Sequence, residues 1–185
     1  MRRDQLAHVL RAAATITKDN DILVIGSNAI LGTFDEDDLP EETTMSIEVD
    51  IAFFDDPEEL KADLVDGAIG EDSLFHASHG VYGQGVGVTT AVLPDEWRSR
   101  LVMFEATAAA PSRALCLDVH DLVVSKLVAG REKDFTFAAA LLGSGLVQAD
   151  VLCERADTLP VLPGVKRRIV AWVQRHGAGI PPDTT

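Results

Sequence analysis

The chain lacks the residues and segments that several protein classes require. Only two of its 185 residues are cysteines, Cys116 and Cys153, and neither has a CxxC partner. We therefore expect free thiols in a reducing compartment, with no disulfide and no zinc site. No apolar stretch approaches the roughly 18 residues of a membrane-spanning helix. The N-terminal MRRDQLAHVL has a charged start but no apolar run after it, which argues against export. These absences predict a cytoplasmic protein without membrane contact.

Basic residues are also scarce, because 16 Lys and Arg stand against 30 Asp and Glu, for a net charge of −14. Residues 35–72 hold 16 of those acids and one base, Lys61, so this window carries −15 and the rest about +1. An apolar fraction of 46% excludes disorder and suffices for a core. The acidity thus belongs to one segment, whose partner is either a cation or only water.

The first 115 residues alternate between helical and strand patterns. Apolar spacing predicts a helix over residues 6–16, a strand over 22–25, and a second helix that begins at residue 28 after a Gly-Ser turn. Residues 32–44 are predicted to form a loop, and the alternation over 45–54 predicts a strand. Its apolar face carries Ile47, Val49, Ile51 and Phe53.

A helix is predicted from Asp56 and Pro57 to residue 67, with Asp56 as its cap. The glycine-rich residues 80–93 favour a turn and a strand over a dinucleotide loop, because no helix follows them directly. Residues 101–105 form a further predicted strand. Four helices follow, over 118–127, 134–142, 150–158 and 164–176. The pattern predicts an α/β (α+β) fold: a mixed sheet flanked by helices over residues 1–115, and a helical part over 116–185 packed against it.

Glu48 and Asp50 are the most informative pair of side chains. Residues two apart on a strand share one face, about 6.6 Å apart along the strand. Two carboxylates at that spacing repel each other, and Mg²⁺, which takes one or two carboxylates plus phosphate oxygens, removes the repulsion. The alternative is that both acids are simply exposed to water.

Gly26 and Ser27 stand at the predicted strand-to-helix turn. A glycine there lets a phosphate approach the backbone, and the following helix start offers free N–H groups beside the serine hydroxyl. Taken alone, most Gly-Ser dipeptides are plain turns.

Gly26-Ser27, an acidic loop and then Glu48-Val-Asp50 in an apolar strand resemble the signature of the nucleotidyltransferase superfamily. The stretch LDVHDLVVSKLVAGREKDFTFAAALL resembles the lysine and R-x-K-D motifs of its AbiEii-type members, which often occur in bacterial toxin–antitoxin pairs. HASHGVYGQGVGVTTAVLPDEWRSRL is similar to an uncharacterised nucleotidyltransferase-like bacterial family. The resemblance covers roughly residues 22–142.

The resemblance implies a transfer of a nucleotidyl group from an NTP to an acceptor hydroxyl, on an RNA end such as that of tRNA or on a protein, with an antitoxin as a possible partner. It implies that Glu48 and Asp50 bind Mg²⁺. The triphosphate would be held by Gly26, Ser27 and Lys126, and the site completed by Arg131, Lys133 and Asp134. From the residues alone, Lys126 is equally a snorkelling lysine at the edge of an apolar stripe, and Arg131 and Asp134 are a possible i,i+3 pair.

Two departures from that signature favour another function. Glu48 stands where the superfamily usually has aspartate, and a third carboxylate is missing, for which Glu105 is the best candidate. The alternative is therefore a catalytically silent nucleotidyltransferase-like module that binds or regulates.

Three other features have simpler readings. His76 and His79 lack a third ligand nearby and favour a surface loop over zinc. The basic run at residues 166–168, with Arg175 and His176, could touch RNA phosphates but is more typical of a solvated helix face. Trp172 is expected to anchor this last helix to the core.

Overall fold

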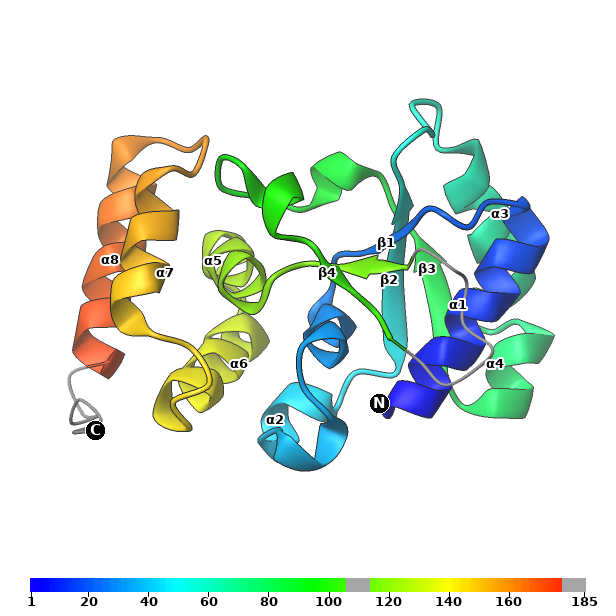
Figure 1. The fold of residues 1–185 in the computed structure, drawn as a ribbon, viewed down its shortest axis with the longest axis horizontal. Coiled ribbons are helices and arrows are strands. Elements are labelled where there is room, and N and C mark those ends of the chain that lie inside the picture. The colour runs from blue at the N-terminus through cyan, green and yellow to red at the C-terminus, as the bar shows by residue number, and fades with distance from the viewer. Residues whose placement is uncertain (106–113, 178–185) are drawn as a thin grey trace.

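The computed structural model describes residues 1–105 and 114–177, which form a five-stranded mixed sheet flanked by helices (Figure 1). The predicted fold class is confirmed. The strand order is β3-β2-β1-β5-β4. The β1–β5 and β2–β3 pairs are parallel, and the β1–β2 and β4–β5 pairs are antiparallel. The strands span β1 Ile22–Val24, β2 Glu48–Phe53, β3 Tyr82–Gly85, β4 Val102–Met103 and β5 Leu115–Cys116.

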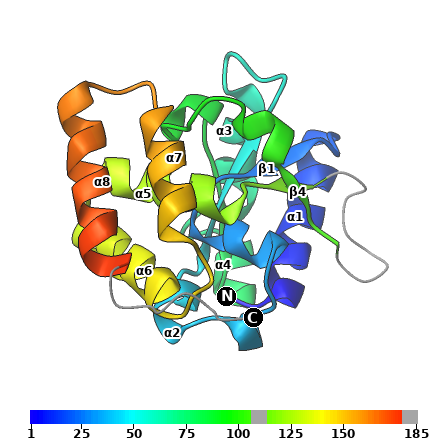
Figure 2. The same ribbon diagram turned by 60° about the vertical axis from the view of Figure 1, so that its left-hand side comes forward.

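Helices lie on both sides of the sheet. In Figure 1, α1, α3 and α4 lie to its right and α5 to α8 to its left, and Figure 2 again shows α7 and α8 side by side. The α-helices span α1 Arg3–Thr17, α2 Glu41–Thr44, α3 Leu60–Ile69, α4 Leu74–His79, α5 Val119–Ala129, α6 Glu132–Gly143, α7 Ala149–Asp157 and α8 Pro163–Gly177. Short 3-10 helices span η1 Ser27–Gly32, η2 Glu36–Asp38, η3 Val88–Thr90 and η4 Trp97–Arg100.

The core lies on both faces of the central strand β1. Ile22, Leu23 and Val24 are all fully buried, which is why this strand has a continuous apolar sequence with no alternation. Helix α1 contributes Leu6 and Leu10, which are also fully buried. The fold therefore holds the end of β1, where Gly26-Ser27 begins, in a rigid position.

Helix α5 is fixed by a buried ion-pair cluster and a capped start. The Asp118 side chain accepts hydrogen bonds from the backbone N–H groups of His120 and Asp121, as predicted for its cap. Asp121, fully buried, accepts two hydrogen bonds from Arg100 at 2.8 and 3.1 Å and lies 3.3 Å from Arg155 on α7. These contacts connect three elements: η4, which precedes β4, helix α5 and helix α7. They thereby set the position of Lys126, which lies further along α5.

The four predicted C-terminal helices are confirmed, and several N-terminal boundaries are wrong. The segment after β1 is the 3-10 helix η1 and not an α-helix. The backbone N–H groups of Ala29 and Thr33 donate to the carbonyl groups three residues earlier, of Gly26 and Ile30. Residues 32–44 contain η2 and α2 in addition to the predicted loop. Strand β2 begins only at Glu48, and Met45 and Ile47 are 74% and 46% exposed.

Helix α3 begins later than predicted, at Leu60. Asp56 still caps it from a distance, because its carboxylate accepts the backbone N–H groups of Lys61 and Ala62 at 3.0–3.1 Å. Glu59 takes the left-handed conformation, which separates Asp56 from the first helical turn. The loop expected around His76 and His79 is also wrong, because both lie on α4. Strand β5 was not predicted, since two residues carry no periodicity. The division of the chain into two domains stays a prediction.

Candidate functional site

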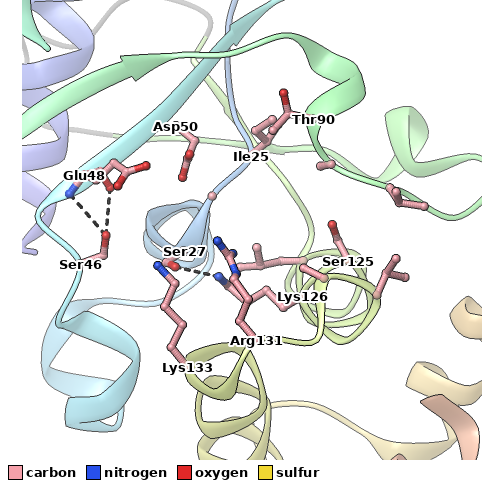
Figure 3. A pocket seen from close by; sticks show the side chains of 16 residues that line it. Ile25, Ser27, Ser46, Glu48, Asp50, Thr90, Ser125, Lys126, Arg131 and Lys133 are labelled. Atoms are coloured by element: carbon pink, nitrogen blue, oxygen red, sulfur yellow. Dashed lines mark hydrogen bonds between the residues drawn. The ribbon is translucent and has the colours of Figure 1, made fainter. Parts of the chain in front are cut away.

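Strand β2 carries two carboxylates on one face, and both line a cleft of about 240 Å³ between the sheet and the helical part of the chain (Figure 3). The carboxylate of Asp50 lies directly against the turn after β1. A Cβ at Gly26 would come within 1.5 Å of Asp50 Oδ2, so only glycine fits there. Gly26 is thus required by the approach of Asp50, a close contact that the sequence pattern alone does not show.

The environment of Asp50 disfavours its charged form. Burial, and then repulsion by Glu48, raise the pKa of Asp50 to about 6. On the neighbouring strand, the Tyr82 hydroxyl donates a hydrogen bond to Glu48 Oε2 at 3.2 Å. Burial and the charge of Glu48 raise the pKa of Tyr82 to about 12, which keeps it a donor at neutral pH. This wall of the cleft therefore favours a cation.

Lys126, on α5, reaches the opposite wall of the cleft. Its ammonium group donates a hydrogen bond to Ser27 Oγ at 2.8 Å and lies 4.7 Å from the centre of the Phe137 ring. Lys126 is only 9% exposed, and burial lowers its pKa against the opposing attraction of Asp134 and Asp50. The ammonium group of Lys126 is thus buried beside a serine hydroxyl, whereas a snorkelling side chain would carry it out to water.

Asp134, on α6, holds two cations in place. Its carboxylate accepts hydrogen bonds from Arg131 Nε at 2.7 Å and Arg131 Nη2 at 3.2 Å, and lies 3.6 Å from Lys126 Nζ. Burial raises the pKa of Asp134, but the Arg131 hydrogen bonds and the Lys126 charge outweigh it and lower the pKa below its usual value. Asp134 is 1% exposed and lies behind the cations, outside the cleft lining. The i,i+3 pair expected from the sequence is present, and it orients Lys126 and Arg131.

The structure gathers seven of the eight predicted site residues in the cleft lining. In Figure 3, Glu48 and Asp50 lie on the sheet wall, while the side chains of Lys126, Arg131 and Lys133 lie on the helical side. The residues in the lining are Gly26, Ser27, Glu48, Asp50, Lys126, Arg131 and Lys133.

Sequence reasoning missed several residues of the cleft. Ser46, Thr90 and Ser125 add hydroxyl groups to its walls. Asn28, 1% exposed, donates a hydrogen bond from Nδ2 to the Glu48 carbonyl at 2.6 Å and so joins η1 to the start of β2. Asn28 is marked in the sequence only by its position directly after Gly-Ser. Thr90 and Ser125 lie in the two stretches that carry the family resemblance, but nothing in those stretches singles out either hydroxyl.

The expectation that Glu105 supplies a third carboxylate is corrected. Glu105 does not line the cleft but a separate hollow with Arg3 and Asp35, because it follows β4 at the other edge of the sheet from β3. By register, the residues beside Glu48 and Asp50 on β3 are Tyr82 and Gln84, and neither is a carboxylate. Within residues 1–105 and 114–177, no three His, Cys, Asp or Glu side chains are grouped as a metal site.

The remaining predicted features lie outside the cleft. His79 lies beside His8, with 3.3 Å between their Nε2 atoms, and the His76 ring lies against Tyr82. Trp172 is half-buried, with its ring centre 5.6 Å from that of Phe135 on α6. Cys116 and Cys153 are free thiols, as expected. The described helices include none that is long and apolar enough to cross a membrane.

Comparison with known proteins gives one match. A family model described as "Nucleotidyltransferase of unknown function" (DUF6036) matches residues 4–161. This is most of the chain, so the chain belongs to that family. No curated protein and no solved structure matches significantly. The expected superfamily is thereby confirmed, and the narrower resemblance to AbiEii-type toxins stays a prediction.

Proposed function

We propose that this member of the nucleotidyltransferase family transfers a nucleotidyl group from an NTP to an acceptor hydroxyl in a Mg²⁺-dependent reaction. The single observation that supports the proposal most is the convergence of the β2 carboxylates, Ser27 and Lys126 on one cleft. Paired acids facing a lysine and a hydroxyl are the groups that phosphoryl-transfer chemistry needs, since it depends on positioning and charge neutralisation.

Glu48 and Asp50 are the side chains that would hold Mg²⁺. They fit it because both are carboxylates on one strand face, and because burial and the repulsion by Glu48 raise the pKa of Asp50 to about 6, which a bound cation would oppose. Glycine at position 26 leaves the Asp50 carboxylate against the turn that carries Ser27. Bound there, Mg²⁺ would neutralise charge on the phosphate oxygens as bonds change at phosphorus.

The chain's own residues bind and orient the triphosphate. The Ser27 hydroxyl and the Lys126, Arg131 and Lys133 cations lie across the cleft from the carboxylates, where they can hold phosphate oxygens. The acceptor oxygen then forms a bond to the α-phosphorus while the bond to the β-phosphate oxygen breaks, and pyrophosphate leaves. The hydroxyl proton passes to solvent, because both carboxylates of the cleft are assigned to the metal.

The acceptor and partners follow from charge and from the sequence resemblance. We infer an RNA end, such as that of tRNA, or a protein hydroxyl as acceptor, and an antitoxin protein as a regulator in the cytoplasm. An RNA would approach along α6 and α8, because residues 35–72 carry most of the acids and repel a polyanion. Arg168 on α8 reaches toward Gly130, next to Arg131 of the cleft, which supports this path.

One observation favours a catalytically silent module as the second candidate. The β3 residues beside the two acids are Tyr82 and Gln84, so no third carboxylate activates the acceptor within the described part of the cleft. Such a module would still bind Mg²⁺ and NTP but would transfer nothing.

The test uses each NTP labelled at the α-phosphate, with Mg²⁺ and either total RNA or cell lysate. We expect label on RNA or protein with the wild type and none with Asp50→Asn, while Asp63→Asn, an exposed acid on α3, behaves as wild type. If no acceptor is labelled but Mg²⁺ and NTP together stabilise the protein by about 2–4 kcal/mol, the silent module is correct. If neither occurs, or Asp50→Asn transfers normally, the proposal is wrong.

A further inference from the structure

A second cavity, of about 520 Å³, adjoins the cleft between α2 and α6. Ser27, Ser46, Lys126 and Lys133 line both spaces, so the two are continuous at the point where the triphosphate is proposed to bind. The cavity has its own walls beyond this junction, which include Thr43, Met45, Thr136 and Phe137. Any ligand that leaves the junction on this side enters the cavity.

Size indicates that the cleft alone does not hold a whole nucleotide. Pockets for small ligands have volumes of about 300–1,000 Å³. The cleft, at about 240 Å³, is below that range, and the carboxylates and cations that would face the phosphates line it. The cavity, at about 520 Å³, is large enough for a nucleoside. The two spaces together accommodate an NTP.

Charge divides the two spaces between the two halves of a nucleotide. Three cations and two carboxylates line the cleft, which Mg²⁺ would make strongly positive. Two cations and three carboxylates line the cavity: Lys126, Lys133, Glu42, Glu132 and Asp134. Because Asp134 is already paired with Lys126 and Arg131, the cavity offers a triphosphate little net attraction, whereas the cleft attracts it. The uncharged nucleoside has no such preference and is free to occupy the cavity.

The cavity walls also offer apolar surface to a flat ring. Met45 borders the cavity with a side chain that is 74% exposed, whereas Phe137 lies almost fully buried beneath Lys126 and offers little surface of its own. Methionine adapts its shape to a ligand and contacts aromatic rings favourably, which gives this exposed apolar side chain a use. The hydroxyl groups of Ser46 and Thr136 and the carboxylates of Glu42 and Glu132 can meet the polar edges of a base and a ribose.

We propose that this cavity is the nucleoside subsite, which holds the ribose and base of the NTP whose triphosphate lies in the cleft. The proposal rests on the nucleotide binding inferred above and adds where the nucleoside lies. The opposite apolar wall of the cleft, near Thr90 and Ser125, is then left for the acceptor.

The test measures binding, by calorimetry with Mg²⁺, of inorganic tripolyphosphate and of the α,β-methylene analogues of the four NTPs, which do not react. Thr136→Trp fills the cavity from an exposed position on α6, and Met45→Trp fills it from the opposite wall. Ser144→Trp, exposed at the far end of α6 and outside both spaces, is the matched control.

We expect the wild type and Ser144→Trp to bind at least one nucleotide analogue about tenfold or more tighter than tripolyphosphate. Both filled variants should bind tripolyphosphate as the wild type does, which also shows that they are folded, and should lose the preference for the nucleotide. If they keep that preference, the nucleoside lies elsewhere and the inference is overturned while the phosphate site stands. If the wild type binds neither ligand, the proposed function fails first.

Discussion

The two walls of the cleft differ in how their charges are balanced. The sheet wall carries Glu48 and Asp50, and the helical wall carries Lys126, Arg131 and Lys133, with Asp134 behind them. On the sheet wall, burial and Glu48 raise the pKa of Asp50 to about 6, because two like charges share one strand face. On the helical wall, burial of Asp134 is outweighed by Arg131 and Lys126, which lower its pKa. The carboxylates of the sheet wall are therefore left in mutual repulsion, whereas the charges around Asp134 compensate one another.

This difference separates charges that stabilise the fold from charges that destabilise it. Asp134 neutralises part of the charge of Lys126 and Arg131 and holds both cations at fixed distances. The Glu48–Asp50 pair stores unfavourable interaction that a bound ligand can relieve, as is common where function opposes stability. Substituting one aspartate on each wall should move stability in opposite directions.

The largest effect is expected from the helical wall. Asp134→Asn removes the charge that compensates the buried ammonium of Lys126, and breaking a buried ion pair costs about 3 kcal/mol or more. We expect the free energy of unfolding, measured by urea denaturation at pH 7, to fall by about this amount. The exposed Asp63→Asn on α3 should change it by less than about 0.5 kcal/mol. An Asp134→Asn variant as stable as Asp63→Asn would show that this wall does not depend on the pair.

A smaller effect of opposite sign is expected from the sheet wall. Asp50→Asn removes a buried repulsion, so the metal-free protein should become more stable by about 1–2 kcal/mol at pH 8. The folded-state pKa of Asp50 is raised, so its contribution to stability is present below pH 3.8 and is lost as the pH rises through about 6. The gain from Asp50→Asn should therefore shrink at pH 5. Destabilisation at pH 8 would contradict the repulsion.

The sequence predicted the elements with strong periodicity and the residues with a recognisable pattern. Apolar spacing predicts helices α1 and α5 to α8, and the capping residue Asp118 marks the start of α5. Seven predicted site residues meet in one cleft. Strand β1, which leads into the Gly-Ser turn, pairs with β2, which carries the acid pair, while α5 and the start of α6 supply the three cations. Adjacent strands in the sequence are often adjacent in the sheet.

The remaining features depend on contacts that are distant in the sequence. Strand β5 has two residues and is defined by its pairing with β1 on one side and β4 on the other. Glu105 follows a strand at the far edge of the sheet, and no local pattern gives that strand order. Asn28 gains its place from hydrogen bonds to the carbonyls of Ser46 and Glu48. The cavity between α2 and α6 needs the packing of two helices some 90 residues apart, which periodicity cannot supply.

The smallest expected effect concerns the cation that the sheet wall favours. A carboxylate must be deprotonated to bind a metal, so protonation of Asp50 competes with Mg²⁺. Above a pH of about 6 Asp50 is ionised and the affinity for Mg²⁺ should level off. Below it, the affinity should fall about tenfold for each pH unit.

Calorimetric titration of Mg²⁺ from pH 5 to pH 8 measures this, with Asp134→Asn as the matched variant. Because Asp134 has a lowered pKa and lies behind the cations, its substitution should leave the midpoint unchanged. A midpoint that moves with Asp134, or an affinity independent of pH, would mean that the two walls do not differ as described.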